Sequence, residues 1–168
     1  MYLIALMMMF MLVPAAYSYP KGAPPGACDL MSPNHGVNVH AQTVPSPYTI
    51  TVSPSTYVCG DTISVTLNGT AFKGFLCQAR PNVNNYSTVG SLSDTDPSVI
   101  ARNRCSGEGT SLTHSEPGNK SSFTFSWTHS GTTNGDVYIV CTVVQSKLVF
   151  WNKLTSSAIT YSGTATTC

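Results

Sequence analysis

Short segments in which apolar and polar residues alternate constrain the fold of this chain more than any other feature. Residues 48–52, 62–68 and 123–127 each place apolar side chains on one face and mostly hydroxyl side chains on the other. A period of two is typical of half-buried strands. Turn-forming Pro, Gly and Asn residues separate these segments, and no amphipathic helix is visible. About seven or eight short strands indicate an all-β antiparallel β-sandwich, with a closed barrel as the alternative.

Two further apolar runs lie between these segments. Residues 72–80, read as a strand, place Phe75 and Cys77 on one face and Gly74 and Leu76 on the other. A glycine inside a strand marks a bulge or a close backbone approach. Residues 136–144 form a nearly continuous apolar run, which predicts a central strand covered on both faces.

The charge content excludes several function classes. Charged residues make up only 9% of the chain, and the net charge is +1. Nucleic-acid binding and attraction to anionic membranes both depend on concentrated positive charge. We therefore expect neither, and we expect no direct lysis of membranes by a cationic surface.

The N-terminus predicts export from the cell. Residues 1–13 are apolar and uncharged, and small side chains at Ala16 and Ser18 occupy the positions that a signal peptidase reads. The run is shorter than the roughly 20 residues that span a bilayer. We predict a signal peptide at residues 1–18 and a single extracellular domain at residues 19–168, without stable membrane insertion. An uncleaved anchor is the alternative.

Cysteine usage agrees with an extracellular location. An even number of cysteines in a secreted chain predicts disulfides, here with about 15 connectivities open. The six cysteines are Cys28, Cys59, Cys77, Cys105, Cys141 and Cys168. None forms a Cys-x-x-Cys pair, so neither a zinc site nor a redox motif is indicated.

Histidines are the main candidates for chemistry. His114 has Ser106 and Glu108 near it in sequence, but a hydrolase needs a nucleophile, base and acid within hydrogen-bond reach, and no G-x-S-x-G elbow is present. We expect a histidine that satisfies local hydrogen bonds, no enzymatic activity and no cofactor. The remaining histidines show no metal-ligand spacing. They are His35, His40 and His129.

Three sequons predict N-glycosylation at Asn68, Asn85 and Asn119. All three lie in segments predicted as turns or loops, where glycans are attached. Asn85 is expected to be the most exposed of them.

Trp151 and a group of cations are candidate contacts for carbohydrate. Lys147 and Lys153 flank Trp151, so an exposed indole there could contact a glycan or a sulfated glycan, while a buried Trp is the alternative. A small, salt-sensitive basic patch is a second candidate. Its members are Lys73, Arg80, Arg102 and Arg104.

Motifs distributed in order along the chain resemble one known family. They are Tyr19 to Pro24, Cys28, Met31, Pro33, His35, Tyr57 to Gly60, Phe72 to Leu76, Gln78 to Arg80, Cys105, Thr113 to Ser115, Lys120, Phe123, Phe125, Trp127, Gly135 to Val137, Thr142 to Val144 and Phe150 to Trp151. This set resembles the reeler (reelin N-terminal) domain. The resemblance implies an immunoglobulin-like β-sandwich.

The resemblance also implies a disulfide pattern. The family pattern pairs Cys28 with Cys105 and Cys141 with Cys168. Two positions depart from the family, because this chain has Cys59 where proline is expected and Cys77 where an aliphatic residue is expected. The remaining pair is then Cys59–Cys77.

Among reeler proteins the chain is most similar to the short insect-type defense proteins, rather than to the membrane-bound ferric-chelate reductases. This similarity implies a role in innate immunity, antimicrobial or through binding to microbial surface glycans. The alternative is an extracellular matrix or adhesion module that binds glycosaminoglycan or a protein.

Overall fold

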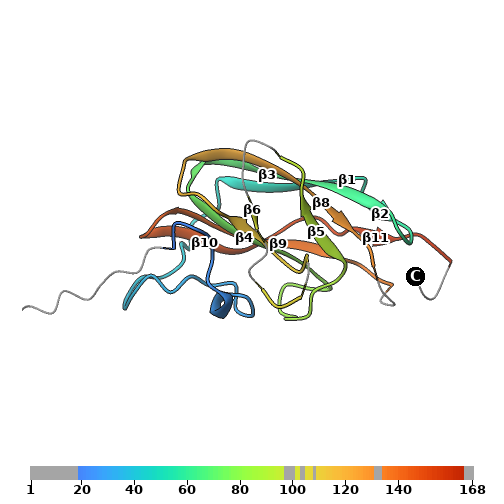
Figure 1. The fold of residues 1–168 in the computed structure, drawn as a ribbon, viewed down its shortest axis with the longest axis horizontal. Helices are drawn as coiled ribbons and strands as arrows, with labels where there is room; N and C mark the ends of the chain where they lie inside the picture. Colours follow the sequence, from blue (N-terminus) through green and yellow to red (C-terminus); the bar gives the residue numbers. More distant parts are fainter. Residues whose placement is uncertain (1–18, 97–100, 103–104, 108, 131–133, 165–168) are drawn as a thin grey trace, which may run out of the picture.

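Two antiparallel sheets stack face to face and form the body of the protein (Figure 1). The computed structural model describes residues 19–96, 101–102, 105–107, 109–130 and 134–164. The predicted signal peptide and Cys168 lie outside these ranges. The stacked open sheets confirm the expected β-sandwich and exclude the alternative of a closed barrel.

The strands divide between the two layers as follows. The four-stranded sheet has the order β1 (Tyr48–Ser53), β3 (Thr62–Phe72), β8 (Lys120–Thr128) and β5 (Ser91–Asp94). The five-stranded sheet has the order β10 (Val149–Thr155), β9 (Tyr138–Ser146), β4 (Gly74–Arg80), β7 (Leu112–His114) and β6 (Ala101–Arg102). A short parallel pair joins β11 (Thr160–Tyr161) to β2 (Thr56–Tyr57), and η1 (Pro25–Ala27) is a single helical turn.

The core lies between the sheets and follows from the alternation in the sequence. Val65 of β3 is in register with Phe125 of β8, and both side chains are fully buried. From the opposite sheet, Phe75 of β4 packs against Phe123 with ring centroids 4.5 Å apart. Aromatic and β-branched side chains on facing strands therefore fill the space between the layers.

Some segments predicted as turns belong to strands. Strand β3 continues through Asn68 and Gly69 to Phe72, with a register irregularity against β8 between Asn68 and Phe72. Gly69 is required there because a Cβ would lie 2.5 Å from the Pro47 carbonyl oxygen. Strands β2, β6 and β7 also lie where the sequence indicates turns or loops. They have only two or three residues, too few for an alternating pattern to be recognised.

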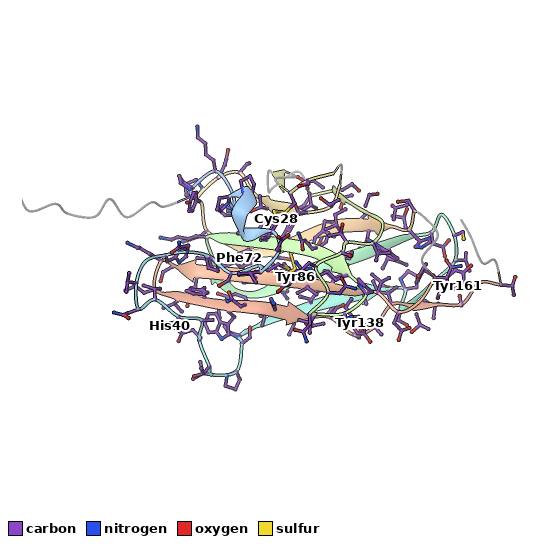
Figure 2. All side chains as sticks on the ribbon, turned by 90° about the horizontal axis from the view of Figure 1, so that it is seen from below. Cys28, His40, Phe72, Tyr86, Tyr138 and Tyr161 are labelled. Carbon is purple, nitrogen blue, oxygen red and sulfur yellow. A yellow bond between two sulfur atoms is a disulfide. The ribbon has the colours of Figure 1, made fainter. Side chains whose placement is uncertain are left out.

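Residues 19–47, here called the N-terminal segment, pack against the outer face of the five-stranded sheet. The segment carries η1 and lies beneath the five-stranded sheet in Figure 1, and Figure 2 shows Cys28 over that sheet when viewed from below. Both faces of β4 are consequently buried along its whole length. The core lies on one side, and the N-terminal segment lies on the other.

The observed disulfides confirm one of the three expected pairings and contradict the other two. The Cys28–Cys105 bridge is present and ties the N-terminal segment to the domain. Cys77 is joined to Cys141, however, so the expected Cys59–Cys77 and Cys141–Cys168 bridges are both wrong. The physical reason is the register of β4 against β9, which places Cys77 directly opposite Cys141 with Cα atoms 4.2 Å apart. Cα atoms are this close in the non-hydrogen-bonded pairs of an antiparallel ladder.

Peptide mapping without reduction tests this connectivity. We expect linked peptides that contain Cys28–Cys105 and Cys77–Cys141. Cys59 is also disulfide-bonded, so Cys168 is its expected partner by elimination. Mass spectrometry of the purified protein would contradict this assignment if it found a peptide linking Cys59 to Cys77.

Candidate functional site

A cleft between the N-terminal segment and the outer face of the five-stranded sheet is a candidate binding site. Its volume is about 150 Å³. Its floor comes from β4 and β9 at the end where Gly74 is paired with Val144. Its other wall comes from Pro24, Ala27 and Met31 of the N-terminal segment. The walls are therefore mostly apolar.

Hydrogen bonds from the sheet hold this segment in place. The Thr142 hydroxyl donates to the Met31 carbonyl oxygen at 2.5 Å, and the Thr113 hydroxyl accepts from the Ala23 amide at 2.9 Å. Further along, the Trp151 indole donates to a carbonyl of the segment at 3.0 Å. Backbone groups of a segment without secondary structure need such partners when they are buried.

Arg80 anchors the same segment at the far end of β4. Its side chain is fully buried, and Nη2 donates to the carbonyl oxygens of Cys28 and Asp29 at 2.8 and 2.9 Å. Nε donates to Gln78 Oε1 at 2.8 Å, and the guanidinium carbon lies 5.8 Å from the centre of the Tyr86 ring. Burial lowers the pKa of Arg80, and the nearby Asp29 carboxylate opposes that change. An arginine so placed is a structural clamp.

His114 closes one end of the cleft. Its ring lies against Gly74, where a Cβ atom would be 2.7 Å from His114 Cε1. Nδ1 lies 3.2 Å from the Phe75 amide nitrogen and 3.3 Å from the Phe75 carbonyl oxygen, and Nε2 lies 3.2 Å from the Tyr19 carbonyl oxygen. The ring tautomer decides which of the two nitrogens donates. The strand expected at residues 72–80 begins only at Gly74, since Phe72 ends β3, and Gly74 permits a close approach, one of the two interpretations that its sequence position allowed. Both ring nitrogens serve backbone contacts, which matches the expected hydrogen-bonding role.

Burial lowers the pKa of His114, mainly because the charged ring would lose its hydration. The positive charge of Lys120 acts in the same direction, while the contacts with Phe75 and Tyr19 oppose it. The neutral ring is therefore the form that holds Tyr19 of the N-terminal segment.

A second candidate surface is the outer face of the four-stranded sheet. Most outward positions in register across its strands carry hydroxyl side chains; Asn68 stands between Thr49 and Ser122, and the Asp96 carboxylate accepts from the Thr124 amide at 3.3 Å. We call the hydroxyl-bearing positions the hydroxyl face. They are Thr49, Thr51, Ser53, Thr62, Ser64, Thr66, Ser91, Ser93, Ser122, Thr124, Ser126 and Thr128.

Neighbouring hydroxyls on this face are hydrogen-bonded in pairs. Thr62 and Thr128 lie with their Oγ1 atoms 3.1 Å apart, and so do Thr66 and Thr124. Each hydroxyl has one donor and two acceptor sites, so a pair keeps unused capacity. All positions of the face are exposed or half-buried. The face can therefore offer rows of donors and acceptors to a polar, uncharged ligand.

The two surface hypotheses from the sequence are not supported. Trp151 is only 8% exposed and packs edge-on against Tyr48, so it is the buried alternative. The basic patch loses Arg80, which is buried, while Lys73 is exposed near the opposite end of β4. Arg104 and the side chain of Arg102 lie outside the described residues.

The sequons differ from expectation in position. Asn68 lies within β3 and not in a turn, on the same side of the sheet as the hydroxyl face. Asn68 and Asn119 are exposed, whereas Asn85 is half-buried and its side chain accepts from the Ser87 amide at 2.9 Å. Asn85 is thus not the most exposed of the three, because its side chain folds back onto its own loop. Occupancy of the sequons stays a prediction.

The histidines do not gather into a site. His35 lines the cleft with Nδ1 2.7 Å from the Lys147 carbonyl oxygen, His40 is exposed, and His129 is buried beside Tyr57. Within the described part of the chain, no group of three or more His, Cys, Asp or Glu side chains is arranged to hold a metal ion. Glu108, considered with His114 and Ser106, lies outside that part. No helix in the described ranges is long and apolar enough to cross a membrane.

Sequence reasoning missed the cleft and the hydroxyl face. The apolar run at residues 136–144 indicated a strand with two covered faces, but nothing local identified residues 19–35 as the cover. The hydroxyl residues of β8 were visible as a pattern. That they continue across four strands depends on strand order and register, which only the structure supplies.

Comparisons with protein families, with individual proteins and with solved structures point to the same family. The chain matches the Reeler domain family over residues 26–167. It is 37% identical over 155 residues to a Danio rerio protein named as ferric-chelate reductase 1, covering 89% of this chain but only 26% of that protein. It therefore spans about a quarter of the length of that relative.

Other relatives are matched over most of their length. A Samia ricini protein named as a defense protein, Hdd11-like, is 33% identical, with 84% of this chain and 87% of that protein covered. The Drosophila melanogaster defense protein l(2)34Fc is 32% identical, with 82% and 85% covered. Among solved structures, the reeler domain of human F-spondin superposes with a TM-score of 0.57 at 19% identity, over 79% of this chain and 93% of that one. This last likeness shows the fold.

Substituting Gly74 tests the contact between His114 and the sheet. We expect Gly74→Ala to lower the free energy of unfolding by about 1–3 kcal/mol, because the added methyl group overlaps the imidazole. Gly118→Ala is the matched control, since a Cβ at Gly118 meets no atom within 4 Å. Urea unfolding curves measure both variants, and equal stabilities would contradict the contact.

The lowered pKa of His114 predicts how stability depends on pH. A group whose pKa is lower in the folded state binds fewer protons there, so its stabilising effect is present above the unfolded pKa near 6.5 and is lost as the pH falls towards the folded pKa. We expect the free energy of unfolding to decrease below about pH 6.5, by at most about 1.4 kcal/mol per pH unit from this group.

Two variants test this pH dependence. His114→Gln removes the buried histidine, and His40→Gln, the control, removes an exposed one. The slope of stability against pH should become shallower in His114→Gln and stay unchanged in His40→Gln. Equal slopes in the wild type and His114→Gln would show that the pKa of His114 is not lowered by folding.

Proposed function

Because the chain belongs to the Reeler family, we propose that it is a secreted protein of innate defence that binds glycans on microbial surfaces. One observation carries the proposal. The chain aligns with insect proteins named as defense proteins over 87% and 85% of their length. The predicted signal peptide and the disulfides support an extracellular site of action.

The hydroxyl face is the surface proposed to bind the glycan. Sugar hydroxyls need closely spaced donors and acceptors, and the rows Thr51–Thr66–Thr124 and Ser53–Ser64 supply them on adjacent strands. The hydroxyl residues themselves carry no charge, and the Asp96 carboxylate, which accepts from the Thr124 amide at 3.3 Å, would repel a sulfate, so the face favours a neutral glycan over a sulfated one. Binding through this face should depend little on salt, because charge screening has no ion pairs to weaken.

We propose binding without catalysis. His114, the candidate base considered from the sequence, is 9% exposed, and its ring nitrogens contact the backbone of Phe75 and Tyr19. A general base must reach the proton that it abstracts. A ring held in this way supports a structural role.

A binding assay across a salt series tests the proposal. Secreted protein is incubated with insoluble peptidoglycan, with immobilised lipopolysaccharide and with heparin. We expect saturable binding to peptidoglycan that changes less than about twofold between low and physiological salt. Binding to heparin alone, lost as salt rises, would overturn the proposal and favour a matrix or adhesion module. Binding to none of the three would also overturn it.

Variants assign the binding to the hydroxyl face. Ser64→Glu introduces a charge at an exposed position in the middle of the face, and we expect peptidoglycan affinity to fall about tenfold. Asn84→Glu adds the same charge at an exposed loop position and should bind as the wild type does. Both variants are made in an Asn68→Gln background, so that no glycan at that sequon covers the face.

Transcript levels should rise after bacterial challenge, and unchanged levels would contradict the defence role.

A further inference from the structure

The cleft beneath the N-terminal segment has the dimensions of a site for a small apolar group. Its volume of about 150 Å³ equals that of engineered apolar cavities that bind benzene. Leu76 and Val144 form its floor, and Pro24, Ala27 and Met31 contribute to the opposite wall. A group of about six carbon atoms fills such a space.

The walls of the cleft are fixed on several sides. The Cys28–Cys105 disulfide secures one end of the segment, and the Thr142 hydroxyl bonds to the Met31 carbonyl oxygen. His35, near the other end, contacts the Lys147 carbonyl oxygen at 2.7 Å. A pre-formed site loses little conformational entropy when a ligand binds.

The rim of the cleft is cationic. Lys73 and Lys147 both line it, and both are exposed. None of the described lining residues carries a carboxylate. Lys120 lies close by, with Nζ 3.3 Å from the Lys73 carbonyl oxygen, and Glu116 is the acidic residue near Lys120. An anionic group at the rim would thus meet two lysines directly.

We propose that this cleft binds a small organic anion in which an apolar group of about six carbon atoms carries a carboxylate. The apolar end occupies the space between Met31 and Leu76, and the carboxylate lies at the rim near Lys73 and Lys147. This site is separate from the hydroxyl face, which lies on the other sheet, and it does not depend on the glycan proposal.

The test is an NMR titration of the secreted protein with hexanoate, in which the backbone amides of Gly74, Leu76 and Val144 report on the cleft. Saturable shifts of these amides are expected. Acetate has the charge without the apolar group, and hexylammonium has the apolar group with the opposite charge. Both should bind at least about tenfold more weakly. Equal binding of either one, or no saturable shift with hexanoate, would overturn the proposal.

Two variants locate the binding. Val144→Phe fills the cleft with a ring that a strand accommodates well, and it should abolish hexanoate binding. Ser64→Phe places the same ring on the opposite sheet and should leave binding unchanged. Thermal unfolding of each variant confirms that it is folded. Unchanged affinity in a folded Val144→Phe would exclude the cleft.

Charge variants test the rim. The double variant Lys73→Gln, Lys147→Gln should weaken hexanoate binding about three- to tenfold, the range for two exposed charges. Lys153→Gln removes a lysine that does not line the cleft and should have no effect. A second experiment measures binding to vesicles of phosphatidylglycerol. If the protein binds these vesicles but not hexanoate, the proposal that the ligand is a free organic acid is overturned.

Discussion

Strand β4 is buried on both faces, and this condition determines how the rest of the chain is arranged around it. An uncovered outer face would leave Leu76 and Val140 in water, so the five-stranded sheet needs a cover. The N-terminal segment is that cover, but it has almost no secondary structure to satisfy its own backbone. The sheet must therefore supply donors, which it does through Arg80, Thr142 and His114.

The same condition explains why a glycine and a buried arginine stand in β4. Gly74 weakens a strand in isolation, yet it allows the ring of His114 to lie against the backbone and to reach Tyr19. Gly22 of the N-terminal segment also permits a close approach to His114, because a Cβ at Gly22 would lie 2.6 Å from the His114 carbonyl oxygen. Arg80 is costly to bury, and two carbonyls and Gln78 accept hydrogen bonds from its Nε and Nη2, while Nη1 is buried without a partner. These residues let the N-terminal segment pack closely against the sheet. The cleft is the space that remains between the points where the segment contacts the sheet.

The sequence predicted what depends on local pattern, and it failed where distant segments meet. Alternation identified β1, β3 and β8 and the inward Phe125, because a period of two is a property of one strand. The pairing of Cys77 depends on which strand lies beside β4 and in which register, and neither is written in the local sequence. A pairing inferred from departures within the family placed Cys59 there, whereas the adjacent β9 brings Cys141 opposite.

The scarcity of charge gives the two candidate surfaces different chemistry. The net charge of the chain is only +1, but charge is distributed unevenly between the two surfaces. The hydroxyl residues on one sheet are neutral, whereas the cleft on the other sheet has Lys73 and Lys147 at its rim. Because the surfaces belong to opposite sheets, the ligands proposed for them would not compete for space. They also respond differently to salt, since exposed lysines are screened over about 8–10 Å whereas hydrogen bonds between hydroxyls are not. The salt dependence of a bound ligand therefore assigns it to one sheet or to the other.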